Sequence, residues 1–232
     1  MPDDPCTVRA EVPSVEKVFD DDAVISRFLS AWYGPPDRPA APPPEAERLP
    51  PPLRAWYGVT SGYARPLLFN HKINPAASVY EDDGMLGFCV DDFEWQEFGV
   101  PSGDEDPVVH RQLIDGDTGW EPHEEGMRLS QFLVAVLLHE TVQGARYGAA
   151  ADGLPRDRLG RLLEPLRPLP GPELFTAQYA GEGLLAIAWP ASGAWSVRLA
   201  AREPQLLAYA AAVPGVGFGP GEWCPPGSGD GS

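Results

Sequence analysis

Residues 81–100 decide the fold, because a turn signal is followed there by two strand signals. The stretch begins Glu81-Asp82-Asp83-Gly84-Met85-Leu86-Gly87-Phe88-Cys89-Val90, in which a tight acidic turn leads into an apolar run. A second strand is predicted over residues 94–100, where the alternation of a pleated strand turns Trp95 away from Glu94 and Gln96. Residues 76–80 lead into a strand before the turn, and residues 108–113 form a third strand after it. We therefore expect the early strands of a sheet here.

Helical patterns lie on both sides of these strands. Residues 24–32 carry apolar side chains at the spacing of one helix face, and the aspartates at 20–22 can cap the first turn. A short helix is predicted from Leu53 to about residues 58–62. A long helix is predicted from Ser130, as N-cap, to about Gly148; it is apolar over most of its circumference, so we expect it at the centre of the core. A last helix is predicted over residues 203–213.

The remaining segments indicate one domain with irregular ends. Residues 175–199 alternate in polarity between glycine-containing turns, which predicts an antiparallel meander. Nine of the eighteen residues from 35 to 52 are proline, which favours a polyproline linker over a helix. We expect an irregular lead-in over residues 1–21, a domain over residues 22–213 and a disordered tail over residues 214–232.

Composition predicts a soluble protein with a sizeable core, because 232 residues with 43% apolar content can fold without covalent staples. Three cysteines, Cys6, Cys89 and Cys224, lie far apart without the spacing of a metal site or a disulfide framework, which favours a reducing compartment. No apolar run approaches the ~20 residues that span a bilayer, and the first residues lack signal-peptide character. We expect a cytoplasmic protein.

Negative charge is concentrated in one part of the chain. Between residues 81 and 125 there are 15 acidic residues and one basic residue, Arg111, so this segment carries −14 of the formal charge of −17. Such charge repels nucleic acids and anionic membranes, and it favours a basic protein partner. The simpler interpretation is that acidic loops only keep the protein soluble.

Three local patterns, taken in order along the chain, carry a resemblance to a known family. They are Leu49-Pro50 leading into Leu53-Arg54-Ala55-Trp56-Tyr57, the strand pair 88–100 followed by Asp106-Pro107-Val108-Val109 and Trp120, and Leu129-Ser130-Gln131-Phe132-Leu133 at the start of the long helix. Together they resemble the SUKH superfamily, whose founding members are yeast cell-wall-synthesis regulators of the Smi/Knr type. The resemblance covers about residues 22–213.

The resemblance implies a single α+β domain with a central, mostly antiparallel sheet packed against helices. It brings no enzymatic activity and no cofactor. In bacteria such domains often resemble immunity proteins, which bind and neutralise the toxin of a related cell, and others are general interaction modules. Many relatives carry a Glu-Asn-Gln-Gly-like turn and then a tryptophan, whereas this chain has Asp91-Asp92-Phe93-Glu94 and Phe98, so partner contacts do not transfer residue by residue.

Two motifs come close to metal sites without completing them. His139-Glu140-Thr141-Val142-Gln143 differs from the zinc motif HExxH at its last position, where glutamine is a poor ligand. Asp115-Gly116-Asp117-Thr118-Gly119 begins like a calcium loop, but Trp120 replaces the turn glycine and Gly126 replaces the bidentate glutamate. Weak calcium binding remains an alternative for Asp104, Asp106, Asp115 and Asp117. Cys89 is expected to be a core residue, because no histidine is tied to it by a recognisable pattern.

The sequence therefore predicts a binding protein without catalytic, metal or cofactor residues. Its contact surface is expected between residues 91 and 106, where acids surround an aromatic residue that suits an interface: Asp91, Asp92, Glu94, Trp95, Glu97, Asp104, Glu105 and Asp106. The preferred hypothesis is an immunity protein that binds and neutralises a basic toxin, such as a nuclease. Two alternatives stay open: a regulatory or scaffold protein, and a hydrolase that uses carboxylates with a metal.

Overall fold

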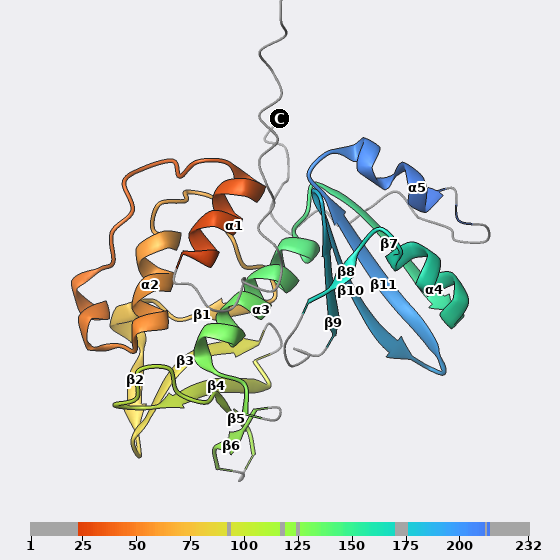
Figure 1. Ribbon diagram of the computed structural model, residues 1–232. Coiled ribbons are helices and arrows are strands. Elements are labelled where there is room, and N and C mark those ends of the chain that lie inside the picture. Colours follow the sequence, from red (N-terminus) through yellow and green to blue (C-terminus); the bar gives the residue numbers. More distant parts are fainter. Residues whose placement is uncertain are drawn as a thin grey trace, which may run out of the picture.

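The computed structural model describes residues 23–91, 94–116, 119–123, 126–169, 176–211 and 213, and in them helices pack around two antiparallel sheets (Figure 1). This confirms the predicted α+β class. The strands are divided between two sheets, whereas one central sheet was expected. The predicted lead-in, the predicted tail and the capping aspartates at 20–22 lie outside the described residues.

The first sheet contains the acidic part of the chain. Its strand order is β1-β3-β4-β5-β6, and β2 also pairs with β3. The strands are β1 (His71–Ile73), β2 (Tyr80–Asp82), β3 (Met85–Asp91), β4 (Gln96–Pro101), β5 (His110–Leu113) and β6 (Glu121–Pro122). The three strands predicted here are thus present, but residues 76–78 form a short 3-10 helix, η3 (Ala76–Ser78), instead of leading directly into a strand.

A glycine pair shapes the face of this sheet that lies away from the core. Gly87 of β3 is opposite Gly99 of β4 in the strand register. A Cβ atom at Gly87 would lie 2.6 Å from the ring of Tyr80, and one at Gly99 would lie 2.7 Å from the ring of Trp120. Both positions therefore require glycine, because the two aromatic rings rest directly on the backbone.

The second sheet has the strand order β7-β11-β10-β9-β8. Its strands are β7 (Tyr147–Leu154), β8 (Arg167–Pro168), β9 (Ala177–Gly181), β10 (Leu184–Ala191) and β11 (Ala194–Ala201). The meander β9-β10-β11 was predicted from its alternation and its turns. Ser192 and Gly193 both have positive φ angles, 49° and 80°, as the tight turn between β10 and β11 requires.

Helix α3 (Leu129–Gln143) lies between the two sheets (Figure 1). On one side Phe132 contacts Phe88 and Phe98 of the first sheet, with ring centroids 5.7 and 5.0 Å apart. On the other side its residues join a core with the second sheet, formed by Val134, Leu138, Val142, Leu185, Ile187 and Ala200. Because both sides are buried, the helix is apolar nearly all round, as the sequence predicted for a central helix.

The C-terminal end of α3 differs from the prediction. The helix ends at Gln143, where the N–H of Gly144 donates to the carbonyl of Glu140 at 2.8 Å, and residues 147–154 form β7 instead of continuing the helix to Gly148. The alanines of β7 favour a helix intrinsically, but pairing with β11 supplies the backbone hydrogen bonds and decides the outcome.

Two helical segments cover the face of the second sheet that points away from α3. They are α4 (Arg156–Leu163), and η5 (Pro204–Leu207) continued by α5 (Ala208–Ala211). Leu159 and Leu162 of α4 are buried against Val197 and Leu199 of β11. The last helix was predicted; α4 was not, because its few apolar residues stand among arginines in a proline-punctuated stretch.

The N-terminal helices α1 (Val24–Tyr33) and α2 (Pro51–Thr60) confirm two predictions. The polyproline prediction is wrong for Pro44–Arg48, which form the 3-10 helix η2. Ala46 and Leu49 from this segment are buried in the first core. Their burial explains the difference, because the segment packs against α2 instead of spanning solvent.

Candidate functional site

The predicted contact residues fall into two groups at opposite ends of β4. Asp91, Glu94 and Trp95 belong to the turn between β3 and β4, whereas residues 104–106 follow the far end of β4. A strand of six residues separates the groups by about 20 Å. Asp92 lies outside the described residues. The structure therefore does not bring all of these side chains to one place.

Asp91, at the end of β3, is hydrogen-bonded to the residues that begin β4. The Asp91 Oδ1 atom accepts hydrogen bonds from the backbone N–H groups of Trp95 at 2.8 Å and Gln96 at 3.2 Å. Glu94 has a φ angle of 53°, a left-handed conformation that such a turn needs. The indole of Trp95 is 69% exposed, so the turn holds a large aromatic side chain in solvent.

Two further exposed apolar residues lie beside Trp95. Leu113 is opposite Gln96 in the register of β4 and β5, and the N–H of Ile114 donates to the carbonyl of Trp95 at 3.0 Å. Leu113 and Ile114 are 50% and 44% exposed. We define the turn patch as Glu94, Trp95, Leu113, Ile114 and Asp115. The prediction missed Leu113 and Ile114, although two apolar residues directly before an Asp-Gly turn were a usable signal.

Two of the predicted contact acids stabilise the fold. Glu97 is buried, and its Oε2 atom accepts hydrogen bonds from the hydroxyl of Tyr80 at 2.6 Å and the amide of Gln112 at 3.1 Å. Asp106 accepts hydrogen bonds from the backbone N–H of Ser130 at 2.9 Å and from its hydroxyl at 2.8 Å, which caps the first turn of α3. Ser130 thus lies in the first turn, and the N-cap position belongs to Arg128.

Asp104 and Glu105 are exposed at the far end of β4. The acidic turn between β2 and β3 lies at this same end, because Ser102 donates its N–H to the carbonyl of Gly84 at 2.9 Å. This end carries acids without an exposed tryptophan. Of the two groups, only the turn patch combines charge with a large exposed apolar surface.

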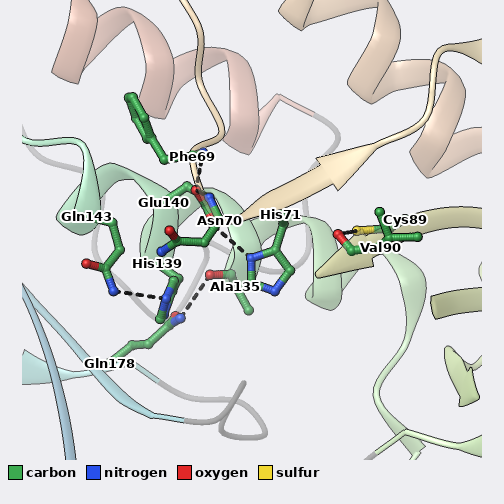
Figure 2. Close-up of polar contacts among 10 residues, drawn as sticks. All are labelled: Phe69, Asn70, His71, Cys89, Val90, Ala135, His139, Glu140, Gln143 and Gln178. Carbon is green, nitrogen blue, oxygen red and sulfur yellow. Dashed lines mark hydrogen bonds and ion pairs between the residues drawn. The ribbon is translucent and has the colours of Figure 1, made fainter. Parts of the chain in front are cut away.

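A buried polar cluster lies where the two sheets meet α3 (Figure 2). Glu140 of α3 is fully buried, and its carboxylate accepts hydrogen bonds from the backbone N–H groups of Phe69 and Asn70, the latter at 2.8 Å. The Nδ1 atom of His71 lies 2.7 Å from the other carboxylate oxygen of Glu140, Oε1. The ring centroids of His71 and the neighbouring His139 lie 5.9 Å apart. The loop before β1 is therefore tied to the middle of the molecule through one carboxylate.

Burial keeps two histidines, His139 and His123, neutral at neutral pH. Burial lowers the pKa of His139 from 6.5 to about 4; the electrostatic interaction with Glu140 opposes this effect, and those with His71 and Arg198 reinforce it. Burial likewise lowers the pKa of His123 to about 4. The Nε2 atom of His139 lies 3.3 Å from the amide nitrogen of Gln143 (Figure 2), so this side chain contacts the histidine where the zinc motif would place a second ligand.

Among the residues that the structure describes, no group of three or more histidine, cysteine, aspartate or glutamate side chains could hold a metal ion. Cys89 is a free, buried thiol, and burial raises its pKa well above the usual value. Such a thiol is protonated at neutral pH and is a poor nucleophile. Cys89 is therefore not a candidate nucleophile.

Comparison with protein-family models, with curated proteins and with solved structures gave no match. No helix in the described ranges is long and apolar enough to cross a bilayer.

Proposed function

We propose that this protein is a protein-binding module that docks a basic protein through the turn patch. The observation that carries the proposal is Trp95, a tryptophan with 69% exposure that lies beside Leu113 and Ile114 and whose backbone N–H is held by Asp91. Tryptophan is enriched among the residues that dominate interface energies, and a rigid anchor loses little conformational entropy when it is buried by a partner.

The negative charge around the turn patch indicates that the partner presents a basic surface. Glu94 and Asp115 of the turn patch are exposed, and the segment 81–125 that surrounds them carries a formal charge of −14. A basic surface that covers Trp95 would approach along a favourable electrostatic field and would be matched at its rim by these carboxylates.

The finer proposal is that the protein is an immunity protein of the SUKH type that neutralises a toxin. It rests on the resemblance of residues 22–213 to that superfamily and on the α+β architecture that the resemblance implies. A nuclease is the toxin class that fits best, because its substrate site is cationic. Three cysteines without disulfide spacing suit a reducing compartment, so the proposed place of action is the cytoplasm.

The test is a differential capture followed by a binding measurement. Native-cell extract is passed over immobilised wild-type protein and over the Trp95→Ala variant, and proteins retained only by the wild type are purified. We expect a basic partner whose Kd rises about 30-fold or more with Trp95→Ala, and whose affinity for the wild type falls with added salt. Glu94→Lys is expected to weaken binding further as the charge reverses.

The matched control is Asp104→Lys, because it makes the same change of charge at the opposite end of β4. It should leave the Kd within a few-fold of the wild type. A partner whose affinity ignores Trp95→Ala, Glu94→Lys and ionic strength would refute docking through the turn patch. A toxin coding region immediately upstream of the gene would favour the immunity protein, and a partner that is not a toxin would favour the scaffold alternative.

A further inference from the structure

A groove on the second sheet lies apart from the turn patch. It has a volume of about 440 Å³ and runs between the end of α3, the first residues of β7, β11 and η5. Cavities that bind small molecules span roughly 300–1,000 Å³, so this groove has room for one compact ligand.

Two arginines line the groove. The guanidinium of Arg146 lies over the ring of Tyr147, 5.2 Å from its centroid, and that of Arg198 lies over the ring of Trp189 at 5.8 Å. An aromatic ring holds the flat face of a guanidinium and leaves the N–H donors at its edge available. Both guanidinium groups are thus held in place by a ring, and their N–H donors remain available to a ligand.

Neither arginine is neutralised within the described part of the chain. No carboxylate there lies within ion-pair distance of Arg146 or Arg198, whereas Arg111 of the first sheet pairs with Glu121 at 3.2 Å. Residues 127–232 carry a formal charge of only −1, from nine acidic and eight basic residues, so the acidic segment of the first sheet does not extend here. The groove is therefore a positively charged site in a protein of charge −17.

Most of the other residues that line the groove are apolar, and many of them have small side chains. Ala149 and Leu199 form part of the wall on the sheet side, and Pro204 and Leu207 of η5 form another part. Gln143 adds one amide at the α3 end. An inorganic ion would occupy only the arginine end and leave these apolar walls in water, whereas an anion with an apolar body would cover them.

We propose that this groove binds a small organic anion, in which a carboxylate or phosphate group contacts Arg146 and Arg198 and an apolar body lies against η5 and β7. Guanidinium groups bind both kinds of anion through paired N–H donors. This site is independent of docking through the turn patch, because the two lie on different sheets.

Titration calorimetry at low ionic strength tests the proposal with four probes. Benzoate and phenyl phosphate carry the anion on an apolar ring, benzyl alcohol keeps the ring without the charge, and inorganic phosphate keeps the charge without the ring. We expect saturable binding of at least one aromatic anion, and binding that is about tenfold weaker or worse for both single-feature probes. Benzoate against phenyl phosphate decides between a carboxylate and a phosphate ligand.

Variants locate the binding. Arg146→Gln and Arg198→Gln should each raise the Kd of the aromatic anion about tenfold, because each loses charge-assisted hydrogen bonds. Arg146 is exposed, so its replacement leaves the core intact even if the change at Arg198 perturbs Trp189. The matched control is Arg167→Gln on β8, at the opposite edge of the same sheet, which should not change the Kd. No saturable binding, equal binding of benzyl alcohol, or a Kd unaffected by Arg146→Gln would overturn the proposal.

Discussion

The two sheets share one helix but differ in what their other surfaces do. The first sheet turns one face to α3 and exposes acidic turns at both ends, within a segment of charge −14. The second sheet is covered on both faces, by α3 on one and by α4 and η5 on the other. A sheet with free turns can display charge at little cost, whereas a sheet buried on both faces must be apolar.

The helix between them links these two environments. Within α3, Phe132 and Leu133 belong to the first core, and Val134 and Leu138 belong to the core with the second sheet. Successive residues of a helix point about 100° apart, so one helix serves two cores. We therefore expect the two sheets to depend on each other for stability. Three experiments, each on residues of α3, test this dependence.

The largest effect is expected from Glu140→Ala. The substitution leaves the N–H groups of Phe69 and Asn70 and the imidazole of His71 without their buried acceptor. Removing one member of a buried polar network costs about 3–5 kcal/mol, and urea unfolding should show a loss of free energy of that size.

Glu164→Ala, at the exposed end of α4, is the control and should stay within about 0.5 kcal/mol of the wild type. A loss below about 1 kcal/mol for Glu140→Ala would mean that the loop before β1 is not held by this carboxylate.

A second prediction compares the two sides of α3. Leu133→Ala opens a cavity beside the first sheet and Leu138→Ala opens one beside the second, and each should lower the free energy of unfolding by about 2–5 kcal/mol. If α3 makes the two sheets one cooperative unit, each variant accelerates the slowest hydrogen exchange in β3 and β4 and also in β10 and β11. Exchange that accelerates only in β3 and β4 for Leu133→Ala would show two independent units.

The smallest effect concerns pH. His139 has a pKa of about 4 in the folded protein and 6.5 as an ordinary value, so the unfolded chain takes up its proton first as the pH falls. The contribution of neutral His139 to the free energy of unfolding is fully present above pH 6.5. It is lost as the pH falls from 6.5 to about 4, and the loss is at most about 3 kcal/mol. The titratable and charged groups that face His139 are Glu140, His71 and Arg198.

The measurement is urea unfolding of wild type and His139→Gln at about pH 7 and about pH 4.5. Between about pH 7 and about pH 4.5 the wild type should lose more free energy of unfolding than the variant does, because only the wild type carries His139. His123, whose pKa is also about 4, changes the stability of both proteins equally, so its effect cancels in the comparison. A difference that is the same at both pH values would contradict the buried, neutral state of His139.

Much of the fold could be predicted because its signals are local. The spacing of Val24, Phe28 and Leu29 marks one face of α1, and the turns at Asp83-Gly84 and Ser192-Gly193 mark two hairpins. The candidate site was predicted in part: Glu94 and Trp95 are exposed just before β4, whereas Glu97 and Asp106 hold internal hydrogen bonds that no periodicity reveals.

The sequence by itself determined which segments form helices or strands in most of the chain, and it placed the negative charge between residues 81 and 125. Both follow from residues that are neighbours along the chain. Only the tertiary structure decided that the strands form two sheets around α3, that β7 is a strand despite its alanines, and that Leu113 and Ile114 lie beside Trp95. The physical reason is that strand pairing and burial join segments far apart in sequence, so their energies do not appear in any local pattern.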